Sequence, residues 1–308
     1  MRLNLRNILR YSITGILLLV LVSVADIRNI TGRISQTDLG IYGIAVLVFS
    51  SIYLWSGLRW RSLTSGLGYS LGLNGSVKII MMSYGFNKIL PLNSGDLTRS
   101  KLMERYTDVD NHGKILGAVA MERFLDVLLL GALTGVSSLT LLNDSGSILW
   151  ILLGAGLLIS SMSLVRLKNK QVLELFDFIE ELGAPVKIVN FMKDGVKGFS
   201  EIPNKKLGES LVWHLMRWAA GILTLYILAL SLGTPVSLFG ATLVTGVMSL
   251  VAALPITPAG LGPVEVLGTG TLVLIGLSTN QAAALVILQR SLGLVLMGGL
   301  GAVVYALD

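Results

Sequence analysis

The chain has 308 residues, of which 53% are hydrophobic and only 14% are charged. Because a soluble domain carries about 25% charged residues, this composition excludes an ordinary water-soluble protein and predicts an all-α polytopic membrane protein. The net charge of +6 does not indicate nucleic acid as a partner, because the basic residues collect in polar segments between apolar runs. In a membrane protein that distribution sets the orientation and attracts anionic lipids.

The N-terminus allows two interpretations. Basic residues precede an apolar run at 13–24, and Ser23, Val24 and Ala25 resemble the cleavage site of a signal peptide. We expect a first span that is retained, because the remaining chain is polytopic. A cleaved signal peptide is the alternative.

Six apolar runs are long enough to cross a bilayer when helix tilt is allowed. They cover residues 8–25, 39–58, 113–142, 147–165, 207–231 and 280–306, to within a few positions. Two further apolar regions, near 74–105 and 237–277, are interrupted, and their halves are too short to cross. We therefore expect about six spanning helices plus two re-entrant broken-helix hairpins in an inverted repeat. Two ordinary kinked spans are the alternative.

The two interruptions share a composition rich in proline and glycine. The residues that should break the helices are Pro91 and Gly95 in the first, and Pro255, Pro258, Gly260 and Gly262 in the second. Proline removes a backbone donor and glycine weakens a helix, so each motif should end one half-helix and start another. Broken segments at matching places in two halves are the best sequence pointer to a transport site.

The distribution of lysine and arginine predicts the topology. The connector at 166–206 and the flanks of the first hairpin are strongly basic, whereas the opposite loops hold only Arg28 and Arg33. The positive-inside rule then places both termini in the cytoplasm of a multi-pass plasma-membrane protein. The first hairpin enters from the inside and the second from the outside, as an inverted repeat requires.

We treat residues 1–308 as one transmembrane domain, with a first repeat half at about 39–142 and a second at about 207–306. Within the connector at 166–206, apolar positions recur at helical spacing. This pattern predicts amphipathic helices on the inner membrane surface. A plain cytoplasmic connector is the alternative.

Three arginines lie inside apolar segments, where an ionisable group needs a partner or a watery cavity. They are Arg123, Arg217 and Arg290. Glu122 and Asp126 lie one turn apart on the helix of Arg123, and Arg123 can pair with Asp126. Either these charges form a structural ion pair, or Arg123 meets an anionic substrate group while a carboxylate accepts protons.

Arg290 follows Gln289 as Arg123 follows Glu122, but no acid accompanies Arg290 within its own span. Glu265 in the second hairpin is the expected partner. If it were unpaired, Arg290 would be available for a phosphate, which a guanidinium binds in bidentate fashion.

Two polar residues, Asp96 and Arg99, follow Gly95 where a half-helix should begin. Backbone N–H groups and the helix dipole favour anions at such a place. Asp96 is either an N-cap or part of a site, and Arg99 is either a surface anchor or a ligand for an entering head group. His214 and Arg217 lie beside tryptophans, which predicts interfacial packing with Arg217 reaching toward the membrane surface.

Enzyme signatures are missing from the sequence. There is no histidine pair for a metal, no phosphate-binding Walker loop, no serine nucleophile motif and no cysteine. We expect a protein without catalytic residues, metal or cofactor.

The order of these motifs resembles the lysylphosphatidylglycerol synthase transmembrane (flippase) family. The matching positions are Trp60, Tyr84–Asn87, Leu90–Pro91, Gly95–Arg99, Glu122, Arg123, Asp126, Leu254–Gly262, Glu265 and Arg290. Ser94, Gly95 and Asp96 stand where the family more often has paired glycines and a glutamate. The resemblance implies an inverted-repeat domain that moves an anionic or zwitterionic lipid between leaflets. Because the chain stops at Asp308, soon after the last span, we expect a stand-alone member without the aminoacyltransferase domain.

Our hypothesis from the sequence is a flippase or scramblase for a phosphate-bearing lipid, either a phospholipid or a polyprenyl-phosphate glycolipid. Arg99, Arg123, Arg290 and Asp96 would bind the head group, and Glu122, Asp126 and Glu265 would position them or couple transport to protons. The alternatives are a secondary transporter of a small soluble anion and a non-transporting membrane assembly protein. Membrane lipids are the expected partners, and Gly298, Gly299 and Gly301 would permit a homodimer.

Overall fold

The computed structural model describes residues 27–89, 95–141, 186–234, 236–253 and 260–308, together with residues 171, 173, 174, 177, 180 and 257. All regular secondary structure in these residues is helical, which confirms the predicted all-α class. The expected spans at 8–25 and 147–165, the signal-peptide alternative and most of the connector before residue 186 lie outside the described residues. So do Pro91, Pro255 and Pro258.

Within the described residues, three helical segments are long and apolar enough to cross a membrane. They are α3 (Leu39–Gly66), α10 (Asn204–Ser231) and the continuous run of α13 (Thr279–Gly293), η3 (Leu294–Leu300) and α14 (Gly301–Leu307). Helix α6 (His112–Leu141) is as long, but four charged residues lie in it, namely Lys114, Glu122, Arg123 and Asp126. The total of six spans stays a prediction.

Both predicted interruptions separate two short helices. The first lies between α4 (Leu73–Ile89) and α5 (Gly95–Met103), and the second between α11 (Leu238–Ala253) and α12 (Pro263–Leu274). At 1.5 Å per residue these helices are roughly 14 to 26 Å long, less than the 30 Å of a bilayer core. The members of each pair pack against each other, so each pair forms a hairpin.

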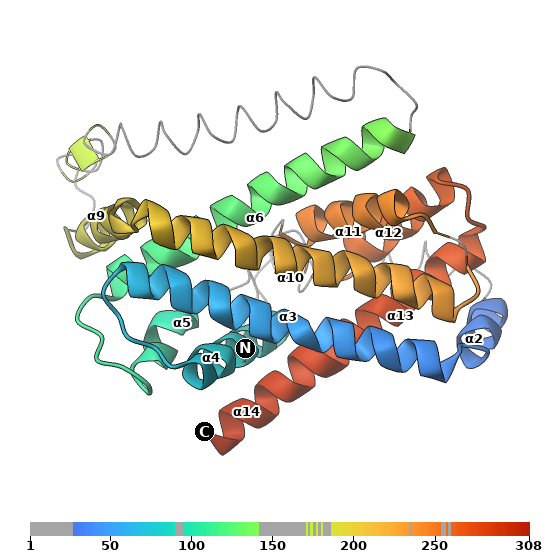
Figure 1. Cartoon of the computed structure of the whole chain (residues 1–308), viewed down its shortest axis with the longest axis horizontal. Coiled ribbons are helices and arrows are strands. Elements are labelled where there is room, and N and C mark those ends of the chain that lie inside the picture. Colours follow the sequence, from blue (N-terminus) through green and yellow to red (C-terminus); the bar gives the residue numbers. More distant parts are fainter. Residues whose placement is uncertain are drawn as a thin grey trace, which may run out of the picture.

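The two hairpins lie toward opposite ends of the long antiparallel helices α3 and α10 (Figure 1). α4 and α5 lie at the end that also holds α9 (Val186–Glu201), whereas α11 and α12 lie at the end that holds α2 (Ile27–Ser35) (Figure 1). The predicted inverted repeat requires this arrangement. Which end faces the cytoplasm stays a prediction.

Glycines are needed at two places near the hairpins, for the backbone conformation at one and for close helix packing at the other. Gly260 and Gly262 have positive φ angles of 70° and 92°, a region that only glycine occupies easily, so the second interruption depends on them. Gly85 of α4 lies against Gly301 of α14, where an added Cβ would stand 2.9 Å from the Gly301 Cα atom. Gly301 is therefore used within the chain, and the homodimer stays a prediction.

Candidate functional site

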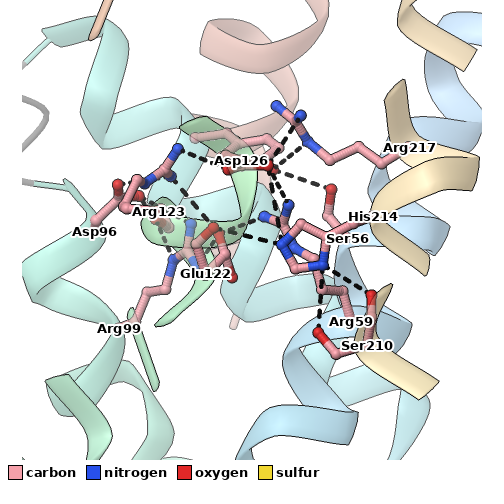
Figure 2. A network of polar contacts seen from close by, with 12 residues as sticks. Ser56, Arg59, Asp96, Arg99, Glu122, Arg123, Asp126, Ser210, His214 and Arg217 are labelled. Atoms are coloured by element: carbon pink, nitrogen blue, oxygen red, sulfur yellow. Dashed lines mark hydrogen bonds and ion pairs between the residues drawn. The ribbon is translucent and has the colours of Figure 1, made fainter. Parts of the chain in front are cut away.

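Seven charged side chains from four helices meet in what we call the buried charge cluster (Figure 2). Helix α3 supplies Arg59, α5 supplies Asp96 and Arg99, α6 supplies Glu122, Arg123 and Asp126, and α10 supplies Arg217. Ion pairs in this cluster therefore connect the first hairpin to three long helices.

Glu122 is the centre of this cluster. It is completely buried and forms ion pairs with two arginines that are also completely buried, Arg59 and Arg99. Nη1 of Arg99 donates to both carboxylate oxygens at 2.8 Å, and its guanidinium lies 5.1 Å above the ring of Trp60. A carboxylate held by two guanidinium groups stays charged and fixed, so Glu122 positions the arginines around it.

Asp126 accepts hydrogen bonds at 3.0 Å from Nη1 of Arg59 and from the indole N–H of Trp218. It also lies 3.3 Å from Nη1 of Arg123, which is the pair expected from their spacing, and 3.6 Å from Nη1 of Arg217. One carboxylate therefore connects α6 to both α3 and α10.

Asp96 lies in the first turn of α5, and its carboxylate contacts side chains from three helices. It accepts from Nη2 of Arg99 at 2.9 Å and from the Asn87 amide at 2.9 Å, and it lies 2.6 Å from Nη2 of Arg123. These contacts tie the first hairpin to α6, which an N-cap alone would not do.

The buried charge cluster has more positive than negative charge. Four arginines face three carboxylates, which leaves an excess of one positive charge when His214 is neutral. His214 is buried beside them, with Nδ1 2.8 Å from the Ser210 carbonyl oxygen and Nε2 3.4 Å from that of Glu122. Buried charge normally balances, so an excess cation favours an anionic ligand.

Arg123 is the arginine at the open edge of the cluster. Its side chain is 42% exposed, compared with 15% for Arg217 and none for Arg59 and Arg99. Its Nε atom has no hydrogen-bond partner among the described residues. Arg123 is therefore the residue of this cluster that an incoming anion reaches most easily.

The second half holds a smaller site. Nε of Arg290 donates to Oε1 of Glu265 at 2.7 Å, which confirms Glu265 as the partner and shows that an unpaired Arg290 is wrong. The other Glu265 oxygen accepts the Gly262 backbone N–H at 2.7 Å, so this carboxylate also caps the start of α12. Lys88, at the end of α4, lies close enough for the charges of Arg290 and Glu265 to act on it.

Sequence reasoning missed one member of the cluster, Arg59, and did not connect Arg217 or the neighbouring His214 with it. Arg59 was expected in a polar flank because the apolar run ends near residue 58, but α3 continues to Gly66 and buries it. Arg99, for which a surface anchor was one alternative, is also fully buried. Arg217, for which interfacial packing was predicted, belongs to the cluster, and His214 lies beside it. A polar stripe of Ser56, Arg59 and Ser62 at three-residue spacing could have indicated the buried face of α3.

Among the described ranges, no group of three acidic or histidine side chains could hold a metal ion. The carboxylates of the buried charge cluster pair with arginines instead of a metal, so this arrangement is suited to recognising a charged group. The fold and these charges define a polytopic membrane protein with two broken-helix hairpins and buried arginine sites.

The chain belongs to the family described as the lysylphosphatidylglycerol synthase TM region, whose sequence model matches residues 7–301. It is similar to archaeal proteins called UPF0104 membrane proteins. The one from Pyrococcus horikoshii is 20% identical over 92% of each chain, and the one from Methanothermobacter thermautotrophicus is 23% identical over 95% of this chain and 91% of the relative. A third, from Methanocaldococcus jannaschii, is 23% identical over 79% of this chain and 77% of its own length.

Proposed function

We propose that this protein is a flippase or scramblase that moves a phosphate-bearing lipid between membrane leaflets, and that it does so without enzymatic chemistry. The observation that carries the proposal is the excess positive charge of the buried charge cluster, with the partly exposed Arg123 at its edge. The family's description, which refers to a lipid synthase's membrane region, supports a lipid as the substrate.

In this proposal Arg123 exchanges a carboxylate for a phosphate. In the resting protein it pairs with Asp96 and Asp126. A phosphate has the geometry to take over one of these pairings in bidentate fashion, while Glu122 keeps Arg59 and Arg99 in place. Because Arg123 then trades one anion for another, its charge is never left bare in the membrane.

Arg290 would be the second binding site for the head group, after Arg123. Its partner Glu265 comes from the second hairpin, as Asp96 comes from the first, so each of the two binding sites joins a broken helix to a neighbouring helix. The acyl or prenyl chains would stay in the bilayer while the head group passes from one binding site to the other.

The test is leaflet exchange in proteoliposomes with labelled phospholipids and polyprenyl-phosphate glycolipids, with and without a proton gradient. Arg123→Gln should lower exchange of the preferred lipid at least roughly tenfold, since one charge-assisted phosphate contact is lost. Arg28→Gln in α2 is the matched control, because Arg28 is exposed and far along the chain from the cluster.

Three outcomes would contradict the proposal. If folded wild-type protein exchanges no lipid but takes up a soluble anion, the protein is a soluble-anion transporter. If the double variant Glu122→Gln/Arg123→Gln, which preserves the net charge of the cluster, exchanges lipid normally, the charges are structural. If Arg28→Gln loses as much activity as Arg123→Gln, the loss comes from general surface charge.

A further inference from the structure

A charged cavity lies at the surface between the end of α3 and the start of α10. Its volume is about 340 Å³, and its polar lining comes from Arg61, Ser62 and Ser65 on α3 and from Lys206 and Glu209 on α10. This size is at the lower end of small-molecule sites, so it accommodates a head group but not a whole lipid.

The lining carries an excess positive charge. Nζ of Lys206 donates to Glu209 at 2.7 Å, and the Ser62 hydroxyl donates to the same carboxylate at 3.2 Å. Glu209 therefore balances Lys206, while Arg61 is exposed and adds a cation beyond that balance. Lys205, also exposed, lies close enough for its charge to act on Glu209. An anion is the ligand that this arrangement favours.

An apolar surface begins at the same cavity. Trp213, which lines it, stacks on Trp55 of α3 with 5.9 Å between ring centroids and 10° between ring planes. Exposed apolar side chains follow along α10, namely Leu211, Val212, Leu215 and Met216. Tryptophan beside basic residues, followed by exposed apolar surface, is typical of the boundary between lipid head groups and acyl chains.

This cavity is separate from the buried charge cluster. Arg59 and Arg61 are two residues apart on one helix, so they lie roughly 200° apart around its axis. Arg59 is completely buried in the cluster, whereas Arg61 faces the cavity. Between the two sites, the Ser62 hydroxyl also donates to the Lys206 carbonyl oxygen at 2.9 Å and holds α3 against α10.

We infer that this cavity binds the head group of an anionic glycerophospholipid from the adjacent leaflet. The phosphate contacts Arg61 and the Lys206–Ser62 edge, and an acyl chain lies along Trp213 and the exposed face of α10. This is a surface lipid site outside the proposed transport route, and it stands whether or not the protein exchanges lipids between leaflets.

The test uses the full chain in phosphatidylcholine nanodiscs that contain increasing fractions of phosphatidylglycerol with brominated acyl chains. Bromine quenches nearby tryptophan, and Trp55 and Trp213 lie at the site. Quenching should saturate at a low mole fraction of brominated phosphatidylglycerol. In Arg61→Gln/Lys206→Gln, half-maximal quenching should need roughly tenfold more of this lipid, because two cations near the surface are removed.

Two controls separate this site from general electrostatics and from ordinary lipid contact. Lys101→Gln/Lys197→Gln removes the same charge from exposed positions outside the cavity and should quench as wild type does. A Trp213→Phe variant should lose most of the saturable quenching if that lipid chain lies along Trp213.

Each contrary result overturns the inference in a different way. Equal quenching by brominated phosphatidylcholine would mean that the surface has no head-group preference. An equal weakening in Lys101→Gln/Lys197→Gln would mean that net charge alone attracts the lipid. Displacement of the brominated lipid by millimolar inorganic phosphate would identify a soluble anion as the ligand.

Discussion

The arginine sites of the two halves share the same arrangement of helices but differ in the charged residues around them. Arg123 and Arg290 each follow a broken-helix hairpin, and each pairs with an acid from that hairpin. Arg123 also belongs to seven charges from four helices, whereas the ion pair described for Arg290 is the one with Glu265. The first site is a network of ion pairs, and the second is centred on the Arg290–Glu265 pair.

This difference separates two roles that buried arginines can have. In the buried charge cluster, Arg59 and Arg99 are completely buried and hold Glu122, while Arg123 remains 42% exposed. In the second site, the side chain of Arg290 is 13% exposed, and it has to serve both as the partner of Glu265 and as the contact for the proposed head group. A network can keep its buried members paired while one arginine exchanges its partner. In the second site the exchange would break the Arg290–Glu265 ion pair itself, so the two sites should respond differently to substitution.

The largest expected effect comes from Glu122→Gln. It leaves Arg59 and Arg99 buried without their shared counter-charge, and breaking a buried ion pair from one side costs about 3–5 kcal/mol. Thermal unfolding in detergent should show this loss, whereas Glu104→Gln at an exposed position should leave the unfolding temperature unchanged. An unaltered unfolding temperature in Glu122→Gln would show that the network does not hold the fold together.

Lysine substitutions compare the two sites directly. Arg99→Lys loses the two-oxygen contact with Glu122 and the bond to Asp96, because an ammonium cannot reproduce the planar fork. The free energy of unfolding should fall by about 2 kcal/mol. Arg290→Lys should lose less, because the contact of Arg290 Nε with Glu265 is one hydrogen bond, which an ammonium can replace. Equal losses would remove the distinction between network and pair.

Arg290→Ala tests whether the second site acts on the ligand more than on the fold. Lipid exchange in proteoliposomes should fall at least roughly tenfold, since the proposed phosphate contact is lost. The protein should remain folded by size-exclusion chromatography. The neutral pair Arg290→Gln/Glu265→Gln is the control, because it removes the ion pair without leaving a bare carboxylate. Normal exchange in Arg290→Ala would exclude this residue from the route.

The smallest effect is expected away from both sites, at Tyr69 in the loop between α3 and α4. Burial raises the pKa of Tyr69 to about 12, and its hydrogen bond to Asp110 adds to the shift. Tyr69→Phe should lower the free energy of unfolding by about 1 kcal/mol at pH 8.

The pH dependence of that effect has a definite sign. The folded-state pKa of Tyr69 exceeds the unfolded value of about 10, so its contribution is complete below pH 10 and is lost as the pH rises toward 12. The difference between wild type and Tyr69→Phe should therefore shrink over this range. A difference that stays constant up to pH 12 would show that the Tyr69–Asp110 bond does not contribute.

The helix interruptions could be predicted because their causes are local. Proline lacks a backbone donor wherever it stands, and the positive φ angles of Gly260 and Gly262 are accessible to glycine in any context. The Arg123–Asp126 pair follows from helical spacing, and Glu265 was the obvious acid for Arg290 because it is the one acid in the neighbouring hairpin. These predictions needed only the chain near each residue.

The buried charge cluster could be predicted only in part because its other contacts are distant in sequence. Arg59 meets Asp126 across 67 residues, and Trp218 meets it across 92. The sequence prediction assigned Arg59 to a polar flank because the apolar run ends near residue 58, and the hydropathy of a run does not show where its helix ends. Once α3 continues past residue 58, the same arginine becomes buried.

The sequence by itself determined a polytopic helical membrane protein, the places where two of its helices break, and the arginines that need a partner in lipid. These properties follow from the transfer free energy of side chains and the conformational limits of proline and glycine. Only the tertiary structure decided that Glu122 holds Arg59 and Arg99, that four arginines face three carboxylates, and that Arg123 is the exposed one. Ion pairs between helices depend on how those helices pack, and packing is a property of the whole chain.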